Sequence, residues 1–185
     1  MKLITILSII LIFIILSASR CKKDPINHID QLPPETQTGA NTFGCLIDGK
    51  VFLPKGNPLS GPIKTAQYQF VNGKQGFGVS GSRKESDGSV KLVGIGGDSI
   101  SLSVATFDLT KFNTSGSYYG GYSEISFSNP GNDFFTNEIN RGQLVIKQFD
   151  TVNQIVSGTF WFDAKNINGQ IVQVREGRFD MPYVR

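Results

Sequence analysis

Four dipeptides, each an Asp or Asn followed by Gly, divide the chain into short apolar segments. They are Asp48-Gly49, Asn72-Gly73, Asp87-Gly88 and Asn168-Gly169. Each pair tolerates the positive φ angles of a type I′ turn and marks a candidate β-hairpin. The segments between them are rich in β-branched and aromatic residues, without an apolar stripe at helical spacing. The sequence therefore predicts an all-β domain over residues 41–185: a single antiparallel β-sandwich or flattened barrel of about eight to ten strands.

Alternating residues predict which strand faces are buried. One face of the strand near residue 160 should be in the core, and Trp161 falls on the opposite face. The expected core residues of this strand are Val156, Gly158, Phe160, Phe162 and Ala164, followed in the last strand by Phe179, Met181 and Tyr183. Ile100, Leu102 and Val104 indicate a further strand with serines opposite. Residues 108–112 predict one helical turn before a Gly/Ser/Tyr loop, and residues 129–137 predict a long loop.

The first twenty residues differ from the rest of the chain. Lys2 is followed by an uncharged apolar run over residues 3–16, and then by the small residues Ser17, Ala18 and Ser19. As a helix this run is roughly 21 Å long, shorter than the ~30 Å hydrocarbon core of a bilayer. Residues 1–20 therefore predict a cleaved signal peptide with a helical apolar region.

Cys21 directly follows this leader. Its position resembles the lipobox of bacterial lipoproteins, and the resemblance implies cleavage before Cys21 and a lipid on its sulfur. Arg20 departs from the small residue that the lipobox prefers. Two alternatives stay open, cleavage after Ser19 or an uncleaved anchor.

Residues 21–40 predict a flexible tether. The segment holds three prolines, many polar residues and the protein's one histidine, His28. Fully extended it would reach roughly 60 Å. Because the predicted domain has no histidine, it lacks the commonest acid-base catalyst and the commonest zinc ligand.

Charge and cysteine content exclude some classes of protein. Without the leader the chain has about 165 residues, enough for one domain with a core, and nearly equal numbers of acidic and basic side chains. We therefore expect no nucleic-acid partner. If Cys21 carries lipid, Cys45 has no disulfide partner, and we expect it to be a buried, unreactive side chain.

Aromatic residues are the best candidates for ligand contact. Tyr118, Tyr119, Tyr122 and Trp161 could present flat apolar faces with polar edges to a glycan or a protein. Packing against strands is the simpler explanation for them.

Other candidate sites are weaker. The carboxylates that could form a hydrolytic pair are Glu124, Glu138, Asp163, Glu176 and Asp180. Asn129, Asn132 and Asp133 could bind calcium, although a loop of this composition also suits turn geometry alone. With no G-x-S-x-G motif either, we expect no enzyme activity, no cofactor and no metal.

Several segments resemble a family of uncharacterised Bacteroidota outer-membrane lipoproteins. The similar segments are residues 21–24 (CKKD), 35–56, 158–170 and 176–183. This resemblance implies an all-β domain held at the outer membrane, facing the periplasm or the medium, and transfers only Cys21 as a site. We expect a lipid-anchored binding module for a glycan or an envelope protein. The alternative is a structural or accessory envelope lipoprotein with no small ligand.

Overall fold

The computed structural model of the protein describes residues 27–56, 61–71, 73–126 and 131–185. Within these ranges the only helix is a 3-10 turn, η1 (His28–Gln31), and no helix is long and apolar enough to cross a membrane. The predicted leader and Cys21 lie outside the described residues. The strands are β1 (Thr42–Ile47), β2 (Lys50–Phe52), β3 (Lys64–Val71), β4 (Lys74–Lys84), β5 (Val90–Asp98), β6 (Thr106–Leu109), β7 (Tyr118–Ile125), β8 (Asn132–Phe135), β9 (Gly142–Asp150), β10 (Ile155–Lys165) and β11 (Ile171–Pro182).

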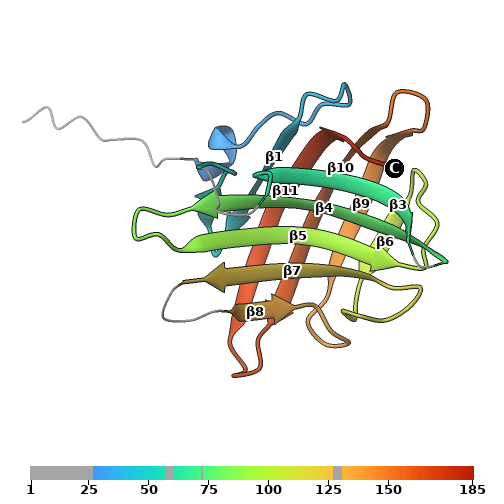
Figure 1. The fold of residues 1–185 in the computed structure, drawn as a ribbon. Helices are drawn as coiled ribbons and strands as arrows, with labels where there is room; N and C mark the ends of the chain where they lie inside the picture. The colour runs from blue at the N-terminus through green and yellow to red at the C-terminus, as the bar shows by residue number, and fades with distance from the viewer. Residues whose placement is uncertain (1–26, 57–60, 72, 127–130) are drawn as a thin grey trace, which may run out of the picture.

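The strands form one sheet that folds onto itself as two layers (Figure 1). Their order is β2-β1-β11-β10-β9-β6-β7-β5-β4-β3, with β8 paired to both β7 and β10. The back layer contains β1, β11, β10 and β9, and the front layer contains β3, β4, β5, β7 and β8. The two layers also meet where Gln67 of β3 bridges to Val184, which follows β11. The predicted sandwich or flattened barrel is therefore confirmed.

The described residues contain eleven strands, one more than the top of the expected range. The short strands β6 and β8 contain aspartate or asparagine, residues that are unfavourable in strands and hide the signal. Between the strands, as far as they are described, pairing is antiparallel except where Leu109 of β6 lies parallel to Tyr118 of β7. Because β6 joins the two layers where the sheet turns, only this one residue pair aligns there. The isolated bridges between Lys55 and Arg83 and between Gln67 and Val184 are also parallel.

All four Asx-Gly pairs lie between hairpin strands, as predicted. Asp48 and Gly49 both have positive φ, 47° and 75°, as a type I′ turn requires. At Asp87-Gly88 and Asn168-Gly169 only the glycine has positive φ. These two hairpins close instead as a type I turn followed by a left-handed glycine, with Glu85 N–H donating to Ser89 and Asn166 N–H donating to Gln170. Of the fourth pair, Asn72 lies outside the described residues.

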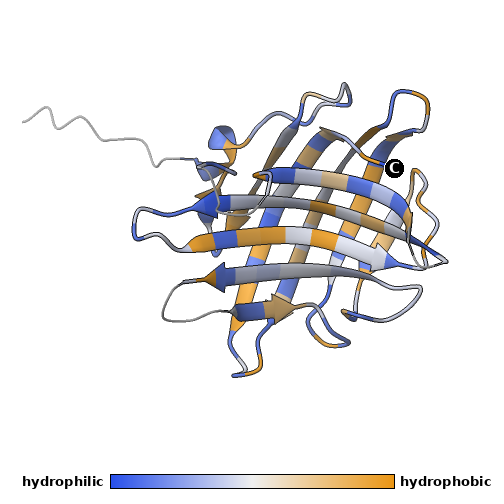
Figure 2. Ribbon diagram, viewed as in Figure 1, coloured by the Kyte–Doolittle hydropathy of each residue, from blue (hydrophilic) through white to orange (hydrophobic). Residues whose placement is uncertain are grey.

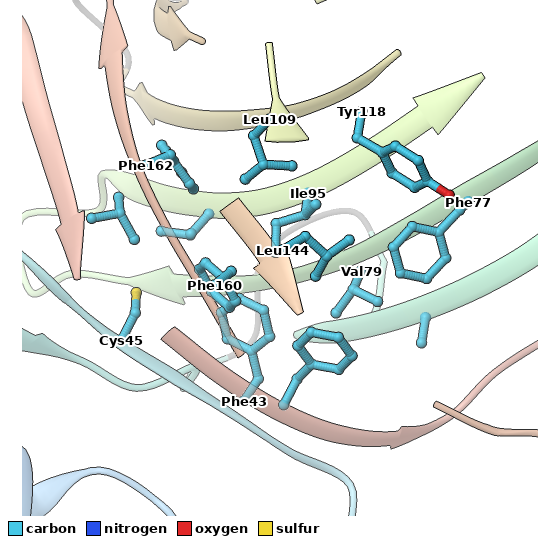
Figure 3. Packing of buried hydrophobic residues seen from close by; sticks show 14 of the residues in the cluster. Phe43, Cys45, Phe77, Val79, Ile95, Leu109, Tyr118, Leu144, Phe160 and Phe162 are labelled. Carbon is cyan, nitrogen blue, oxygen red and sulfur yellow. The ribbon is translucent and has the colours of Figure 1, made fainter. Parts of the chain in front are cut away.

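The predicted core faces are confirmed between the layers. Every expected core residue of β10 and of the last strand is buried, and Phe162 is completely so. Figure 3 shows Phe43, Phe160 and Phe162 of the back layer facing Val79, Ile95 and Tyr118 of the front layer. Each such burial contributes about 1.5–3 kcal/mol. Figure 2 shows the alternation of hydrophilic and hydrophobic residues along the strands.

Three local predictions are wrong. Residues 100–104 form no strand, although Ile100 and Leu102 are buried, and Val104 is exposed. The helical turn predicted over residues 108–112 is replaced by the end of β6 and an irregular turn, and the following tyrosines lie in β7 rather than in a loop. Asn132 and Asp133 belong to β8. In the last two cases pairing with a neighbouring strand, which a local pattern does not contain, decides the backbone; residues 100–104 instead fill the core without strand pairing.

Residues 32–40, which we call the strap, lie against the back layer although they belong to the predicted tether. Leu32 is buried, and the carboxylate of Asp180 is fully buried beneath the strap. Asp180 accepts hydrogen bonds from Thr36 Oγ1 at 2.6 Å and from three backbone N–H groups, those of Thr38, Gly39 and Ala40, at 2.9, 2.7 and 3.1 Å. Burial favours the neutral acid, but these hydrogen bonds outweigh it and lower the pKa of Asp180. The strap therefore contacts the folded domain through Leu32 and the bonds to Asp180.

Candidate functional site

A groove on the outer face of the back layer is the best candidate for a ligand site. It has a volume of about 370 Å³ and crosses β9, β10 and β11. Its polar and aromatic lining residues are Glu35, Gln143, Lys147, Thr159, Trp161, Arg175, Glu176 and Arg178. The groove is within the size range of small-molecule sites.

Two β-bulges shape this groove. In β11, Arg175 and Glu176 together oppose the single residue Trp161 of β10, and Glu176 has a left-handed φ of 54°. In β9, Lys147 is the extra residue opposite the step from Ser157 to Gly158. Bulges bend a strand and redirect side chains, and they are frequent beside functional sites. Here they bring side chains from three strands around one indole ring.

Trp161 is the centre of the groove and has 43% of its surface exposed. The Arg175 guanidinium lies 5.4 Å from the centre of the indole ring, a cation–π contact. Arg175 is itself held by Asp163, whose Oδ1 accepts from Nη2 at 2.6 Å, and by the carbonyl of Phe162 at 3.0 Å. The aromatic platform and its neighbouring guanidinium are therefore fixed relative to each other.

Ion pairs surround the platform and balance its charge. Arg178 pairs with Glu176 at 3.2 Å, and Lys147 pairs with Glu35 of the strap. The strap thus forms one wall of the groove. An exposed aromatic face beside amide, guanidinium and carboxylate groups can stack on an apolar ring face and exchange hydrogen bonds with hydroxyl groups.

The four predicted ligand residues do not come together. Trp161 lies in the groove of the back layer, whereas the three tyrosines belong to β7 in the front layer. Side chains alternate along a strand, so Tyr118 and Tyr122 face the core and are 7% and 6% exposed, while Tyr119 faces outward.

Tyr118 is a core residue. Its ring packs on Phe107 with centres 4.4 Å apart, and its hydroxyl donates to the Ser101 carbonyl at 3.2 Å. Burial, with a smaller effect from Tyr68, raises the pKa of Tyr118 to about 12. It is therefore unavailable to a ligand, contrary to our expectation.

Tyr119 covers a glycine instead of offering a free ring. It pairs with Gly96 across the strands, and a Cβ on Gly96 would lie 2.6 Å from the Tyr119 hydroxyl oxygen. Phe112 and Phe135 stack beside it with centres 3.9 Å apart. A shallow second groove of about 280 Å³ runs along this face, lined largely by glycine and small polar residues.

The candidate carboxylates each have a separate structural partner. Asp163 and Glu176 pair with Arg175 and Arg178 beside the groove, and Glu124 pairs with Lys91. Glu138 pairs with Arg141, and Asp180 holds the strap. We find no contact that joins two of these carboxylates within the described part of the chain.

The remaining candidates lie in ordinary structural positions. Across the described ranges, no group of three or more His, Cys, Asp or Glu side chains could hold a metal ion. Asn132 and Asp133 hydrogen-bond to Asn166 and Ser123, and Asn129 lies outside the described residues. Cys45 is fully buried as predicted, and burial raises the pKa of its thiol.

Sequence reasoning found Trp161 but missed its neighbours in the groove. Arg175 and Lys147 reach it because of the bulges, and Glu35 reaches it because the strap folds back. Neither a bulge nor a long-range contact leaves a local sequence pattern. Alternation along β10 was the one signal available, and it placed Trp161 correctly.

By fold and by this groove, the chain is an all-β sandwich with an open, aromatic surface site. It belongs to the family described as a domain of unknown function, DUF6252, which matches residues 63–181. A search of the curated proteins found no match to the chain, and neither did a search of the solved structures.

Proposed function

We propose that this protein is an exported, lipid-anchored envelope protein that binds a glycan in the groove around Trp161. The proposal places it at the outer membrane of a Bacteroidota cell, facing the periplasm or the medium, as a non-enzymatic binding module. Two kinds of support are independent of each other. The leader and Cys21 support export and anchoring, and the groove supports binding.

The observation that carries the binding proposal is the exposure of Trp161 at the meeting point of two bulges. Trp161 offers an open aromatic face beside a fixed cation, and such a face can stack on the apolar side of a ring. Sugars fit this surface because their C–H faces stack on indole while their hydroxyls contact Gln143, Arg178 and Glu176. A protein partner would require a larger apolar surface than one ring.

Binding to a glycan array, with the full-length protein purified in detergent, tests the site. We expect Trp161→Ala to weaken binding by more than about tenfold, which corresponds to about 1.4 kcal/mol. Phe112→Ala is the matched control, because it removes a partly exposed ring from the opposite layer. Wild-type binding by the Trp161 variant would refute the groove. Absence of glycan binding by the wild type would favour a structural or accessory role.

Mass spectrometry and cell fractionation test the anchor separately. We expect a diacylglyceryl mass on Cys21 and membrane recovery of the wild type, with Cys21→Ser released or retained as an uncleaved precursor. Cys21 lies outside the described residues of the domain, so circular dichroism of both proteins checks that the domain is folded. An unmodified thiol at Cys21 would contradict lipid anchoring.

A further inference from the structure

A second pocket opens between the two layers at one end of the sandwich. It has a volume of about 380 Å³ and is lined by the β1–β2 hairpin, the ends of β4 and β7, and the starts of β5, β8 and β11. Its apolar lining comes from Ile47, Val51, Phe52, Phe134 and Val172. The mouths of β-barrels are common sites for small ligands.

Charged side chains at this pocket neutralise one another. Arg83 lies 5.2 Å over the Phe52 ring and binds Glu85 through Nε and Nη2, at 2.8 and 2.5 Å. Lys91 lies 3.7 Å from both Glu85 and Glu124. Lys50 and Asp48 of the β1–β2 turn add one charge of each sign to the lining. The charges at the pocket therefore balance and give no strong preference for a charged ligand.

The hydroxyl of Tyr122 is a hydrogen-bond donor at this pocket that has no partner among the described residues. Tyr122 is only 6% exposed and lines the pocket, yet its hydroxyl has no hydrogen-bond partner among the described residues. Burial, together with the nearby carboxylates of Glu124 and Asp48, raises its pKa, so it stays a neutral donor. The hydroxyl is not among the fully buried unpaired atoms of the described residues, so it opens to the pocket, where a ligand oxygen can accept a hydrogen bond from it.

Two side-chain amides face the same space with donors to spare. The Oδ1 of Asn132 and the Oε1 of Gln170 both accept from Asn166 Nδ2, at 2.9 and 2.7 Å. Their amino groups have no acceptor within the part of the chain that the structure describes. The pocket therefore combines unpaired donors, a carboxylate acceptor on Glu124 and an apolar floor.

We propose that this pocket binds one neutral saccharide ring, such as the end of a glycan chain. A sugar hydroxyl can accept from Tyr122, Asn132 or Gln170 and donate to Glu124. Its C–H face can contact the more open apolar lining residues Val51 and Ile171. This site shares only its ligand class with the Trp161 groove, and it stands on different residues of a different region.

Backbone amide NMR of the full-length protein in detergent tests this proposal. The probes are glucose, galactose, mannose and N-acetylglucosamine at millimolar concentrations, with glucuronate as the charged comparison. We expect at least one neutral sugar to cause saturable shifts at Tyr122, Asn132 and Gln170. Tyr122→Phe should weaken this binding about five- to tenfold and leave Tm unchanged, because the lost hydroxyl bonds to no described residue.

Tyr118→Phe is the matched control, since it removes a hydroxyl from the same strand that is bound to Ser101 in the core. It should leave sugar binding at this pocket intact. The position of the shifts, at Tyr122, Asn132 and Gln170 rather than around Trp161, separates this site from the groove. Gln170→Ala, at an exposed hairpin position, provides a second variant that should weaken binding. Unchanged binding by Tyr122→Phe, shifts confined to the groove, tighter binding of glucuronate or no saturable shift with any sugar would each overturn the proposal.

Discussion

The outer faces of the two layers differ although both belong to one sheet. On the front layer, small residues such as Gly78, Ser80 and Gly94 line the surface groove. The rings of Tyr119 and Phe135 pack over glycines of neighbouring strands. On the back layer, long planar and charged side chains stand around Trp161, and the strap covers the rest. The front face has few groups with which to hold a ligand, whereas the back face concentrates them.

The difference shows that bulges and the strap, rather than strand content, create a site on this fold. β9 and β11 carry bulges opposite β10 beside the groove, whereas the ladders of β3, β4, β5 and β7 run without a register shift. A regular ladder spreads its side chains evenly over the sheet. A bulge places adjacent residues on one side and gathers side chains from several strands.

Substitution of Asp180 tests this comparison with the largest expected change in stability, because only the back layer has a strap. We expect Asp180→Ala to lower the free energy of unfolding by about 3 kcal/mol, since several charge-assisted hydrogen bonds are lost. Chemical denaturation at neutral pH measures this loss. Asp163→Ala is the control, because its half-exposed pair with Arg175 should contribute less than about 1 kcal/mol.

Acid should release the same contribution in the wild type. The pKa of Asp180 is lower in the folded protein than its ordinary value, so the unfolded chain takes up the proton more readily. The stabilisation is therefore complete above about pH 4, the ordinary range of aspartate, and is lost as the pH falls through the lowered value. In Asp180→Asn this part of the acid dependence should vanish. A variant that keeps the wild-type pH profile would show that the strap is held by other contacts.

Glycines of the front layer give the second test, with a smaller effect. A Cβ on Gly120, which faces inward, would lie 2.5 Å from the Phe162 ring, whereas a Cβ on the outward Gly78 would meet only Gln67 at 3.4 Å. We expect Gly120→Ala to destabilise the protein by about 2 kcal/mol through overpacking. Gly78→Ala should change stability by less than about 0.5 kcal/mol. Equal thermal unfolding of the two variants would contradict this distinction between inward and outward glycines.

Ser157 gives the smallest expected effect and the opposite sign. It pairs with Asp180 across β10 and β11, is 1% exposed, and its hydroxyl has no hydrogen-bond partner among the described residues. Removing an unpaired buried hydroxyl should raise the free energy of unfolding of Ser157→Ala by about 1 kcal/mol. Thr159→Ala, on the same face but outside the strap, should not stabilise. A destabilised Ser157 variant would indicate a partner for this hydroxyl.

Much of the fold could be predicted because its signals are local. An Asx-Gly pair fixes a hairpin through its own backbone preferences, and the Val156-to-Ala164 alternation fixes the buried face of β10. The strands β6 and β8 could not be predicted, because pairing with β9 and β7 stabilises segments of low strand propensity. Residues 100–104 could not be predicted either, for a different reason: they fill the core without strand pairing.

The candidate site could be predicted only in part. Trp161 was correctly placed outward, but Tyr118 and Tyr122 were grouped with Tyr119 because they are close in sequence, and alternation separates them in space. Asp180 was a candidate acid, and its place beneath the strap makes it a structural residue instead. The match of residues 63–181 to a family of unknown function includes Trp161 and Asp180 but not the strap that contacts them.

The sequence alone determined the all-β class, the hairpin positions and the outward direction of Trp161, because backbone preference and alternation act over a few residues. Tertiary structure alone decided that Glu35, Lys147, Trp161 and Arg175 share one groove and that Tyr122 opens into another pocket. The residues that line each of these two sites come from distant parts of the chain. Only strand order, bulges and the strap's bonds to Asp180 bring them together, and none of these has a short-range signature.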